Sequence, residues 1–154
     1  MSASRLQADP DFKDPSFGEP ISEKASIRIC SSGDDDMPEL HACLVRGPVM
    51  PNAFVTASEQ LPWVILDLKQ SRQITGIHIR NTPGKNGAKN TGLTVEFSSD
   101  RKTWTSVFQG PDTAPAEWKI DLLEKNTPTR YVRIGLKQDN PRVFRLSRVT
   151  VYAK

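Results

Sequence analysis

The chain has 154 residues, which is the size of one domain, for which roughly 100–200 residues is typical. Its 36% hydrophobic and 25% charged residues exclude a disordered chain, and no apolar run approaches the roughly 20 residues that span a bilayer. The polar opening predicts no secretory signal peptide. Twelve scattered prolines argue against a helix bundle, because proline breaks a helix interior. Composition therefore favours an all-β domain.

The net charge of +3 is unevenly distributed along the chain. Residues 1–79 hold 7 basic and 11 acidic side chains, whereas residues 80–154 hold 14 basic and 7 acidic ones. A basic half suits an anionic partner such as nucleic acid, a sulfated glycan or a lipid surface. Because no basic cluster is continuous, we expect these cations to decorate the solvent faces of strands and predict no nucleic-acid partner.

Two cysteines, Cys30 and Cys43, each lie among apolar neighbours. They form neither a CxxC pair for zinc nor a disulfide framework. We expect two buried thiols, with a single disulfide as the alternative, and the compartment stays open.

Residues 1–24 are rich in Asp, Pro, Ser and Glu without periodicity, and predict an extended lead-in to a domain at 25–154. Period-two alternation predicts the first strand at 25–30. Residues 39–46 fit either a short strand or a turn of helix, and residues 53–56 a short strand.

From Trp63 onward the strand signal is stronger. The nearly continuous apolar run at 63–68 is typical of a strand covered on both faces. Alternating patterns then predict strands at 74–80, 93–97, 103–108, 117–122, 130–136 and 144–152, with Ile77, Ile79, Val132, Ile134, Leu136, Val149 and Val151 facing inward. About eight strands with no convincing helix between them predict a sandwich or barrel.

Five short segments carry a further signal through their order and spacing. They are a strand running from Trp63 to Asp67-Leu68, the Ile-Thr-Gly-Ile run at 74–77, Ser98 and Asp100 before Trp104, the Arg-Tyr-Val-Arg-Ile run at 130–134, and a last strand closing on Tyr152. Together they resemble the discoidin domains, also called coagulation factor V/VIII type C domains. The resemblance covers residues 62–152 well and 25–61 loosely. It implies an all-β, antiparallel β-sandwich, a jelly roll of the galactose-binding-like type.

Several side chains have expected structural roles within this fold. Trp63 and Trp104 are expected to anchor the core, since large aromatic side chains mostly bury. Arg130 or Arg133 is expected to pair with a carboxylate such as Asp67. Arg101 stands where the family usually has glycine, so the hairpin before Trp104 needs another geometry.

Many members of the family bind a structural calcium ion between an early loop and an acidic residue of the last strand. Here the early loop reads Val45-Arg46-Gly47, and Arg148 stands at the position of the acid. Calcium prefers oxygen ligands and two arginines would repel it, so we predict no metal and no cofactor. The run Asp34-Asp35-Asp36 has chelating groups, but adjacent carboxylates on a loop are expected to be solvated.

Motifs of catalysis are missing from the sequence. It has no G-x-S-x-G elbow, no H-E-x-x-H and no glycine-rich phosphate loop after a strand. Its only histidines are His41 and His78, and we expect His78 to be a surface or half-buried side chain. No specific carboxylate pair suggests glycoside hydrolysis. We therefore predict that the protein is not an enzyme.

The resemblance implies a glycan-binding module that uses loops at one end of the sandwich, in an extracellular or periplasmic setting and as a part of a larger protein. Sugar-binding relatives use an arginine and an asparagine near the loop at 81–91, which makes Arg80, Asn81 and Asn90 the candidates, with Phe144 as the stacking aromatic. The alternative is that these asparagines only build turns. Thr82 interrupts the pattern of fucose-binding relatives, so no sugar is assigned.

A rival function is a protein- or lipid-interaction module that uses the basic C-terminal half as its contact surface. The run at 49–54 offers apolar side chains for loop tips that enter a lipid surface, although a buried loop explains it as well.

Overall fold

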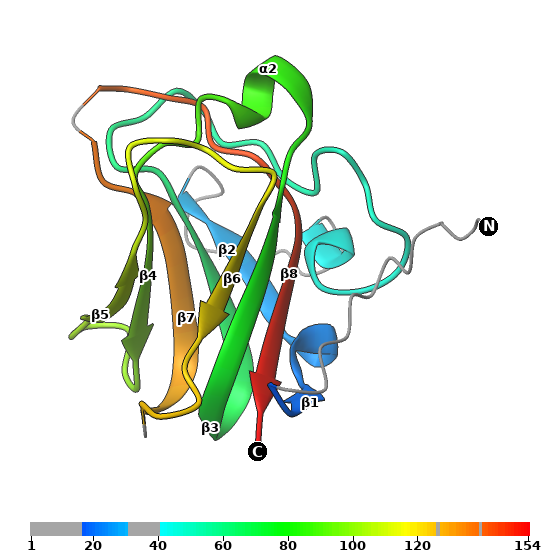
Figure 1. Ribbon diagram of the computed structural model, residues 1–154, viewed down its shortest axis with the longest axis vertical. Coiled ribbons are helices and arrows are strands. Elements are labelled where there is room, and N and C mark those ends of the chain that lie inside the picture. The colour runs from blue at the N-terminus through cyan, green and yellow to red at the C-terminus, as the bar shows by residue number, and fades with distance from the viewer. Residues whose placement is uncertain (1–16, 31–40, 126, 139) are drawn as a thin grey trace.

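The structure, a computed structural model, describes residues 17–30, 41–125, 127–138 and 140–154. Most of the predicted lead-in and the run Asp34-Asp35-Asp36 lie outside these residues. The described strands are β1 (Glu19–Pro20), β2 (Ser26–Ile29), β3 (Trp63–Asn81), β4 (Leu93–Ser98), β5 (Thr105–Gln109), β6 (Glu117–Asp121), β7 (Pro128–Leu136) and β8 (Leu146–Ala153) (Figure 1). Short helical segments are the 3-10 helices η1 (Ser22–Lys24) and η3 (Ala42–Leu44) and the single turn α2 (Gly84–Gly87). None of the described helices is long and apolar enough to cross a membrane.

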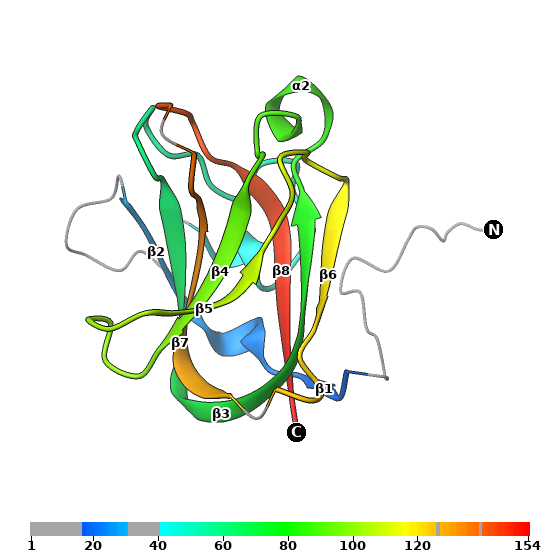
Figure 2. The same ribbon diagram turned by 60° about the vertical axis from the view of Figure 1, so that its left-hand side comes forward.

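The strands form two antiparallel sheets that face each other, as Figure 2 shows. One sheet has the order β1-β8-β3-β6, and the other has the order β2-β3-β7-β4-β5. Both sheets therefore contain β3. The predicted all-β antiparallel sandwich is confirmed.

Strand β3 joins two segments that the sequence predicts as separate strands. Its residues 63–73 pair with β2 and β7, and its residues 74–81 pair with β8 and β6. The strand bends near Lys69, which has a φ of 74°, and the register with β7 shifts between Asp67 and Arg72. Because a left-handed residue interrupts the pleat, one strand carries two alternation patterns.

The inward faces of the two sheets form one hydrophobic core. The residues predicted to face inward are all buried in it, among them Ile77, Val132 and Val149. Burial of each such side chain contributes about 1.5–3 kcal/mol. The predicted alternation of these strands is therefore confirmed.

The outer face of the β1-β8-β3-β6 sheet is covered over β8 and the neighbouring part of β3, whereas the outward-facing residues of β6 are exposed. Helices η1 and η3 lie against β8, and the segment 47–56 is hydrogen bonded to its start, so that every residue of β8 is buried. This cover explains why His78 and Arg148, which alternate with core residues, are themselves buried. The expectation of a surface or half-buried His78 is wrong because the sequence does not reveal a second layer over this sheet.

Three local expectations are resolved by the structure. The described part of residues 39–46 forms η3 rather than a strand. Residues 53–56 form a loop, whose Ala53 N–H donates to Leu146 O at 2.8 Å. In the described part of the lead-in, β1 pairs with β8.

The two cysteines are separate thiols, and each is half buried rather than fully buried. Cys30 Sγ donates to Glu59 Oε2 at 2.9 Å, and Cys43 Sγ lies 3.9 Å from Ala53 O. The alternative of a disulfide between them is therefore wrong for this structure.

Candidate functional site

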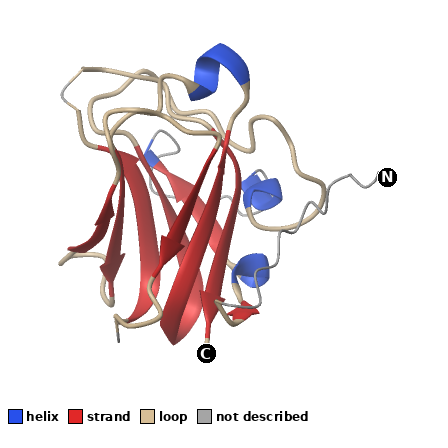
Figure 3. Ribbon diagram, viewed as in Figure 1, coloured by secondary structure: helices blue, strands red, loops and turns tan. Residues whose placement is uncertain are grey.

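Long loops gather at the end of the sandwich that carries α2 (Figure 3). They are the segments 47–56, 82–92, 110–116 and 137–145. The loops differ in chain position but meet because the antiparallel strands that they connect end at the same edge. The end of the sandwich that the sequence analysis predicts as the binding site is thus the end with the longest exposed segments.

One pocket at this end has a volume of about 740 Å³ and includes Arg80; we call it the Arg80 pocket. It lies between the segments 49–51, 82–88 and 114–117. Its walls are mostly apolar, and Met50, which lines it, is exposed. A pocket of roughly 300–1,000 Å³ with apolar walls and few polar groups is typical of small-molecule sites.

Arg80 and Glu117 are the charged residues among the described residues that line this pocket. They are direct partners in the register of β3 and β6, so their side chains leave the same face of the sheet. The Arg80 guanidinium is half exposed and makes no hydrogen bond or ion pair with any described residue. A donor fork without a partner therefore lies beside a carboxylate.

A buried histidine holds Glu117 in place. His78 Nε2 lies 2.6 Å from Glu117 Oε1, and the two side chains are 1% and 49% exposed. Burial lowers the pKa of His78, although the carboxylate opposes this effect, so we assign a neutral imidazole that donates to Glu117. That hydrogen bond lowers the pKa of Glu117, which is therefore an ionised acceptor at the pocket.

Asn81 lies in the wall of the Arg80 pocket, but its side chain is used within the protein. Its amide nitrogen donates to Gly87 O at 3.0 Å and to Pro115 O at 2.9 Å. Its oxygen accepts from Asn90 Nδ2 at 2.9 Å, and Asn90 also donates to Arg145 O at 2.6 Å. Both asparagines are buried. They position the loops, which corresponds to the structural alternative in the sequence analysis.

Phe144 lies away from the surface of the loops. Its side chain is fully buried and meets the ring of Phe54 edge to face, with 5.3 Å between the ring centroids. A buried ring offers no face to a sugar, so the structure corrects its expected stacking role. The pattern of residues 144–152 already identifies it as part of an apolar segment, and burial follows from that pattern.

A second pocket, of about 510 Å³, lies at the same end between the segments 86–91 and 140–145; we call it the Arg142 pocket. Lys89, Arg142 and Arg145 line it together with polar uncharged side chains. Arg142 links the two segments, because its NH1 donates to Lys89 O at 3.0 Å and to Thr91 O at 2.9 Å. No pattern in the sequence distinguishes these three residues from other basic residues of the C-terminal half.

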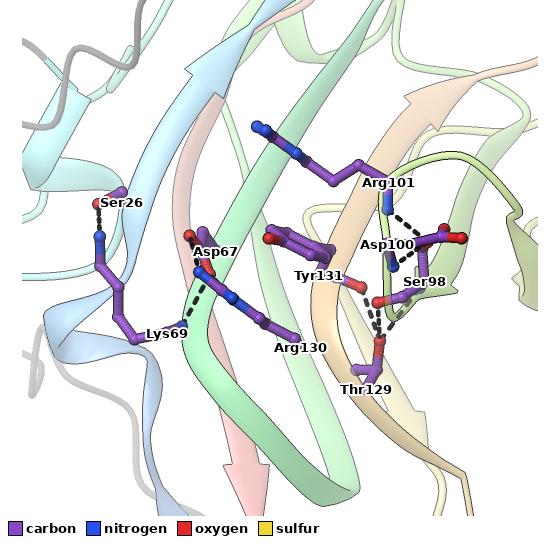
Figure 4. Close-up of polar contacts among 9 residues, drawn as sticks. All are labelled: Ser26, Asp67, Lys69, Ser98, Asp100, Arg101, Thr129, Arg130 and Tyr131. Carbon is purple, nitrogen blue, oxygen red and sulfur yellow. Dashed lines mark hydrogen bonds and ion pairs between the residues drawn. The ribbon is translucent and has the colours of Figure 1, made fainter.

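The expected structural arginine lies in the β2-β3-β7-β4-β5 sheet, at the end away from the two pockets (Figure 4). Arg130 binds both oxygens of Asp67, at 2.9 Å and 3.1 Å, which confirms that pairing. Arg101 has a φ of 65°, so the turn before Trp104 places an arginine in the left-handed region. Asp100 Oδ1 accepts from the backbone N–H groups of residues 102 and 103 in that turn. The left-handed region is the one that glycine favours, so Arg101 adopts a glycine-like conformation, and the expectation that the arginine forces another hairpin geometry is wrong.

The two tryptophans expected in the core lie on the outer face of the β2-β3-β7-β4-β5 sheet. Trp63 and Trp104 are half buried and line a shallow pocket of about 400 Å³, and Arg133 lies over the Trp104 ring at 4.2 Å. The core-anchor prediction is wrong because both residues point away from the facing sheet. Arg133 Nε donates to Glu96 at 3.0 Å, in keeping with a structural role.

The region expected for calcium in this family holds two guanidinium groups instead. Arg46 NH1 donates to Glu23 O at 2.7 Å and to Ala25 O at 3.2 Å, and Arg148 NH2 donates to Gly47 O at 2.5 Å. Carbonyl oxygens of this kind are ligands that calcium takes, but here cationic donors use them. The donor set does not fit a calcium ion. Among the described residues, no cluster of His, Cys, Asp and Glu suited to a metal exists.

Comparison with known proteins gives the fold relatives. No curated protein matches the chain in sequence. Among solved structures, a fucose-binding module of Streptococcus pneumoniae is 16% identical, with a TM-score of 0.72 over 92% of this chain and 100% of that one. The lectin domain of lectinolysin, solved with Lewis B antigen, is 19% identical, with a TM-score of 0.70 over 88% and 97% of the two chains. The family 32 carbohydrate-binding module of NanJ from C. perfringens, solved with galactose, is 14% identical, with a TM-score of 0.65 over 86% and 96%.

These similarities agree on the sandwich architecture described above. The sequence model of the F5/8 type C domain matches residues 50–149, which is more than half of the chain. The matched range contains β3 to β7 and the start of β8 and, apart from Val49, every described residue that lines the two pockets. The chain belongs to the F5/8 type C domain family.

Proposed function

We propose that the protein is a non-catalytic carbohydrate-binding module and that a sugar binds in the Arg80 pocket. The observation that carries this proposal is the half-exposed Arg80 guanidinium, which has no partner among the described residues and lies beside an ionised Glu117. A sugar offers hydroxyl groups that both donate and accept. Arg80 supplies donors and Glu117 supplies acceptors within one pocket.

The apolar walls of the pocket support the same ligand class. Val49, Met50, Pro83 and Pro115 surround the charged pair and provide a surface for the C–H face of a sugar ring. Hydrogen bonds fix these walls before a ligand arrives: Thr82 donates to Pro51 O, and Asn81 joins the other two segments. A preformed pocket lowers the entropy cost of binding.

The family and its fold relatives support a glycan ligand, since the similar structures include a fucose-binding module and complexes with Lewis B antigen and with galactose. We infer that the protein shares this role, and with it an extracellular or periplasmic setting as one module of a larger protein. Glu117 is the single carboxylate among the described residues that line the pocket. Glycoside hydrolysis commonly needs a pair of carboxylates, which supports binding without catalysis.

Calorimetric titration with galactose, fucose and Lewis b oligosaccharide tests the proposal. We expect at least one of these sugars to bind, and Arg80→Gln and Glu117→Gln each to weaken its binding about tenfold or more. Arg72→Gln is the matched control, because Arg72 is a half-buried arginine that lies midway along the same strand and lines neither pocket. Equal affinity in wild type and Arg80→Gln would place the sugar elsewhere.

Ionic strength separates this function from the rival one. Affinity for a neutral sugar should change little between 50 and 500 mM salt, whereas a protein or lipid surface bound through charge loses affinity steeply over roughly this range. Binding of anionic lipid vesicles without binding of any sugar would favour the interaction module. Several cations of the basic half are already paired, such as Arg130 with Asp67 and Arg133 with Glu96, which argues against that outcome.

A further inference from the structure

The Arg142 pocket concentrates positive charge, and no acidic side chain is found among the described residues that line it. Three cationic side chains from two segments line it, namely Lys89, Arg142 and Arg145. By contrast, Arg130 and Arg133 each have a carboxylate partner within 3.0 Å.

Arg142 differs from Lys89 and Arg145 because its charge is buried. The residue is 7% exposed, and its NH1 donates to Lys89 O, Thr91 O and Thr91 Oγ1, all of which are uncharged. Its Nε and NH2 are buried and have no hydrogen-bond partner among the described residues. A buried charge is costly unless an opposite charge compensates it. Burial lowers the pKa of Arg142, as expected for a cation that is removed from water without an opposite charge beside it.

Lys89 and Arg145 place accessible cations above this buried one. Lys89 is exposed and Arg145 half exposed, and neither side chain makes an ion pair or hydrogen bond with a described residue. Their backbones are fixed, since Lys89 O accepts from Arg142 and Arg145 O accepts from Asn90. The backbone positions that carry both cations are therefore held by hydrogen bonds, which keeps their charges at this pocket.

The two pockets are neighbours on the same loop. Gly87 and Ala88 line the Arg80 pocket, whereas Asn86 and Lys89, one residue further out on each side, line the Arg142 pocket. The hydroxyl group of Ser58 and the amide group of Asn140 complete the second pocket and suit the hydroxyl groups of a sugar, whereas the Thr91 hydroxyl is used by Arg142 and Gln138.

We infer that the Arg142 pocket binds the anionic group, carboxylate or sulfate, of an acidic saccharide. This inference rests on the proposed function, because it assigns the class of saccharide. Nucleic acid fits less well, because no aromatic side chain among the described residues lines the pocket to stack a base, and the cations form one patch rather than a stripe.

Calorimetry with galactose, galacturonate and galactose 6-sulfate as probes tests the inference. We expect an acidic probe to bind at least tenfold more tightly than galactose, and the comparison of galacturonate with galactose 6-sulfate shows which anion is preferred. The double variant Lys89→Gln/Arg145→Gln should bind all three probes with the affinity that the wild-type protein has for galactose. Lys85→Gln is the matched control, because Lys85 is an exposed lysine of the same loop that lines neither pocket.

A thermal measurement tests the anion site without any sugar. Sodium sulfate should raise the Tm of the wild-type protein and of Lys85→Gln more than it raises the Tm of the double variant. Sulfate stabilises folded proteins in general, and the shift that remains in the double variant measures this general effect. Equal shifts in all three proteins would overturn the inference.

The outcomes separate this inference from the proposed function. Arg80-dependent binding of galactose with no preference for acidic probes overturns the inference and leaves the function standing. A pocket-dependent sulfate shift without binding of any saccharide overturns both the function and the acidic-saccharide assignment. Tighter binding of a single-stranded oligonucleotide than of either acidic sugar, lost in the double variant, would show that the partner class is wrong.

Discussion

Asn90 donates its side-chain amide to Asn81 Oδ1 at 2.9 Å, and both side chains are buried between the loops that form the two pockets. Asn81 belongs to the end of β3, and Asn90 lies just before β4. Through their other bonds the pair also fixes Gly87 O, Pro115 O and Arg145 O. The shape of both pockets therefore depends on two amides that are not free to bind a ligand.

Replacement of Asn81 by Ala should lower the free energy of unfolding by about 2–3 kcal/mol, because buried polar groups that it serves would lose their partners. Arg80→Ala should change it by less than about 0.5 kcal/mol, because its guanidinium has no partner to lose among the described residues. Urea denaturation of the two variants measures both values. Equal loss of stability would mean that Arg80 is a structural residue.

Calcium should not affect the stability of the protein. The carbonyl oxygens of Glu23, Ala25 and Gly47 accept hydrogen bonds from Arg46 and Arg148, which leaves a cationic environment where the ion would bind. Melting curves with EDTA and with millimolar calcium chloride should superimpose. A calcium-dependent rise of several degrees would contradict this assignment.

The alternation of apolar residues predicts the core and most strands because a period of two directly reports which side chains face inward. It does not report how strands pair. The pairing of Arg80 with Glu117 joins residues 37 positions apart through the β3–β6 register, and nothing in either segment specifies that neighbour. The resemblance supplies Arg80 as a candidate, but its carboxylate partner becomes visible only in the folded sheet.

The sequence also does not report which polar and aromatic side chains are buried. Trp63 looks like a core residue by size, yet lies on an open sheet face, whereas His78 looks like a surface residue and is covered by loops. Arg142 sits in a polar loop and gives no sign that its guanidinium is buried. In each case, segments that are distant in the sequence determine whether the side chain is buried or exposed.

Replacement of Phe144 by Leu should reduce stability without altering sugar affinity. The ring is fully buried against Phe54, so a smaller side chain leaves a cavity and costs about 1–3 kcal/mol. Sugar binding by the folded variant should match that of the wild type, because the ring lines neither pocket. A selective loss of sugar affinity at unchanged Tm would restore Phe144 as a ligand contact.

The protein should lose stability as the pH falls below about 6.5, the ordinary pKa of a histidine in the unfolded chain. Burial lowers the pKa of His78 in the folded state, so between the two pKa values the unfolded state binds the proton and the folded state does not. His41 acts in the same direction, because burial lowers its pKa as well. Each histidine contributes a slope of at most about 1.4 kcal/mol per pH unit.

Glu117 adds a separate loss of stability at lower pH. Its hydrogen bond with His78 lowers the pKa of the carboxyl below the ordinary 4.5, so its contribution is present above that value and disappears as the pH falls through the folded-state pKa. Urea denaturation from pH 7.5 to 4 should therefore show a slope beginning near 6.5, which His78→Gln reduces and which His41→Gln reduces independently. An unchanged slope in His78→Gln would mean that the pKa of the buried imidazole is not lowered in the folded protein, so that it takes up a proton beside Glu117 as readily as in the unfolded chain.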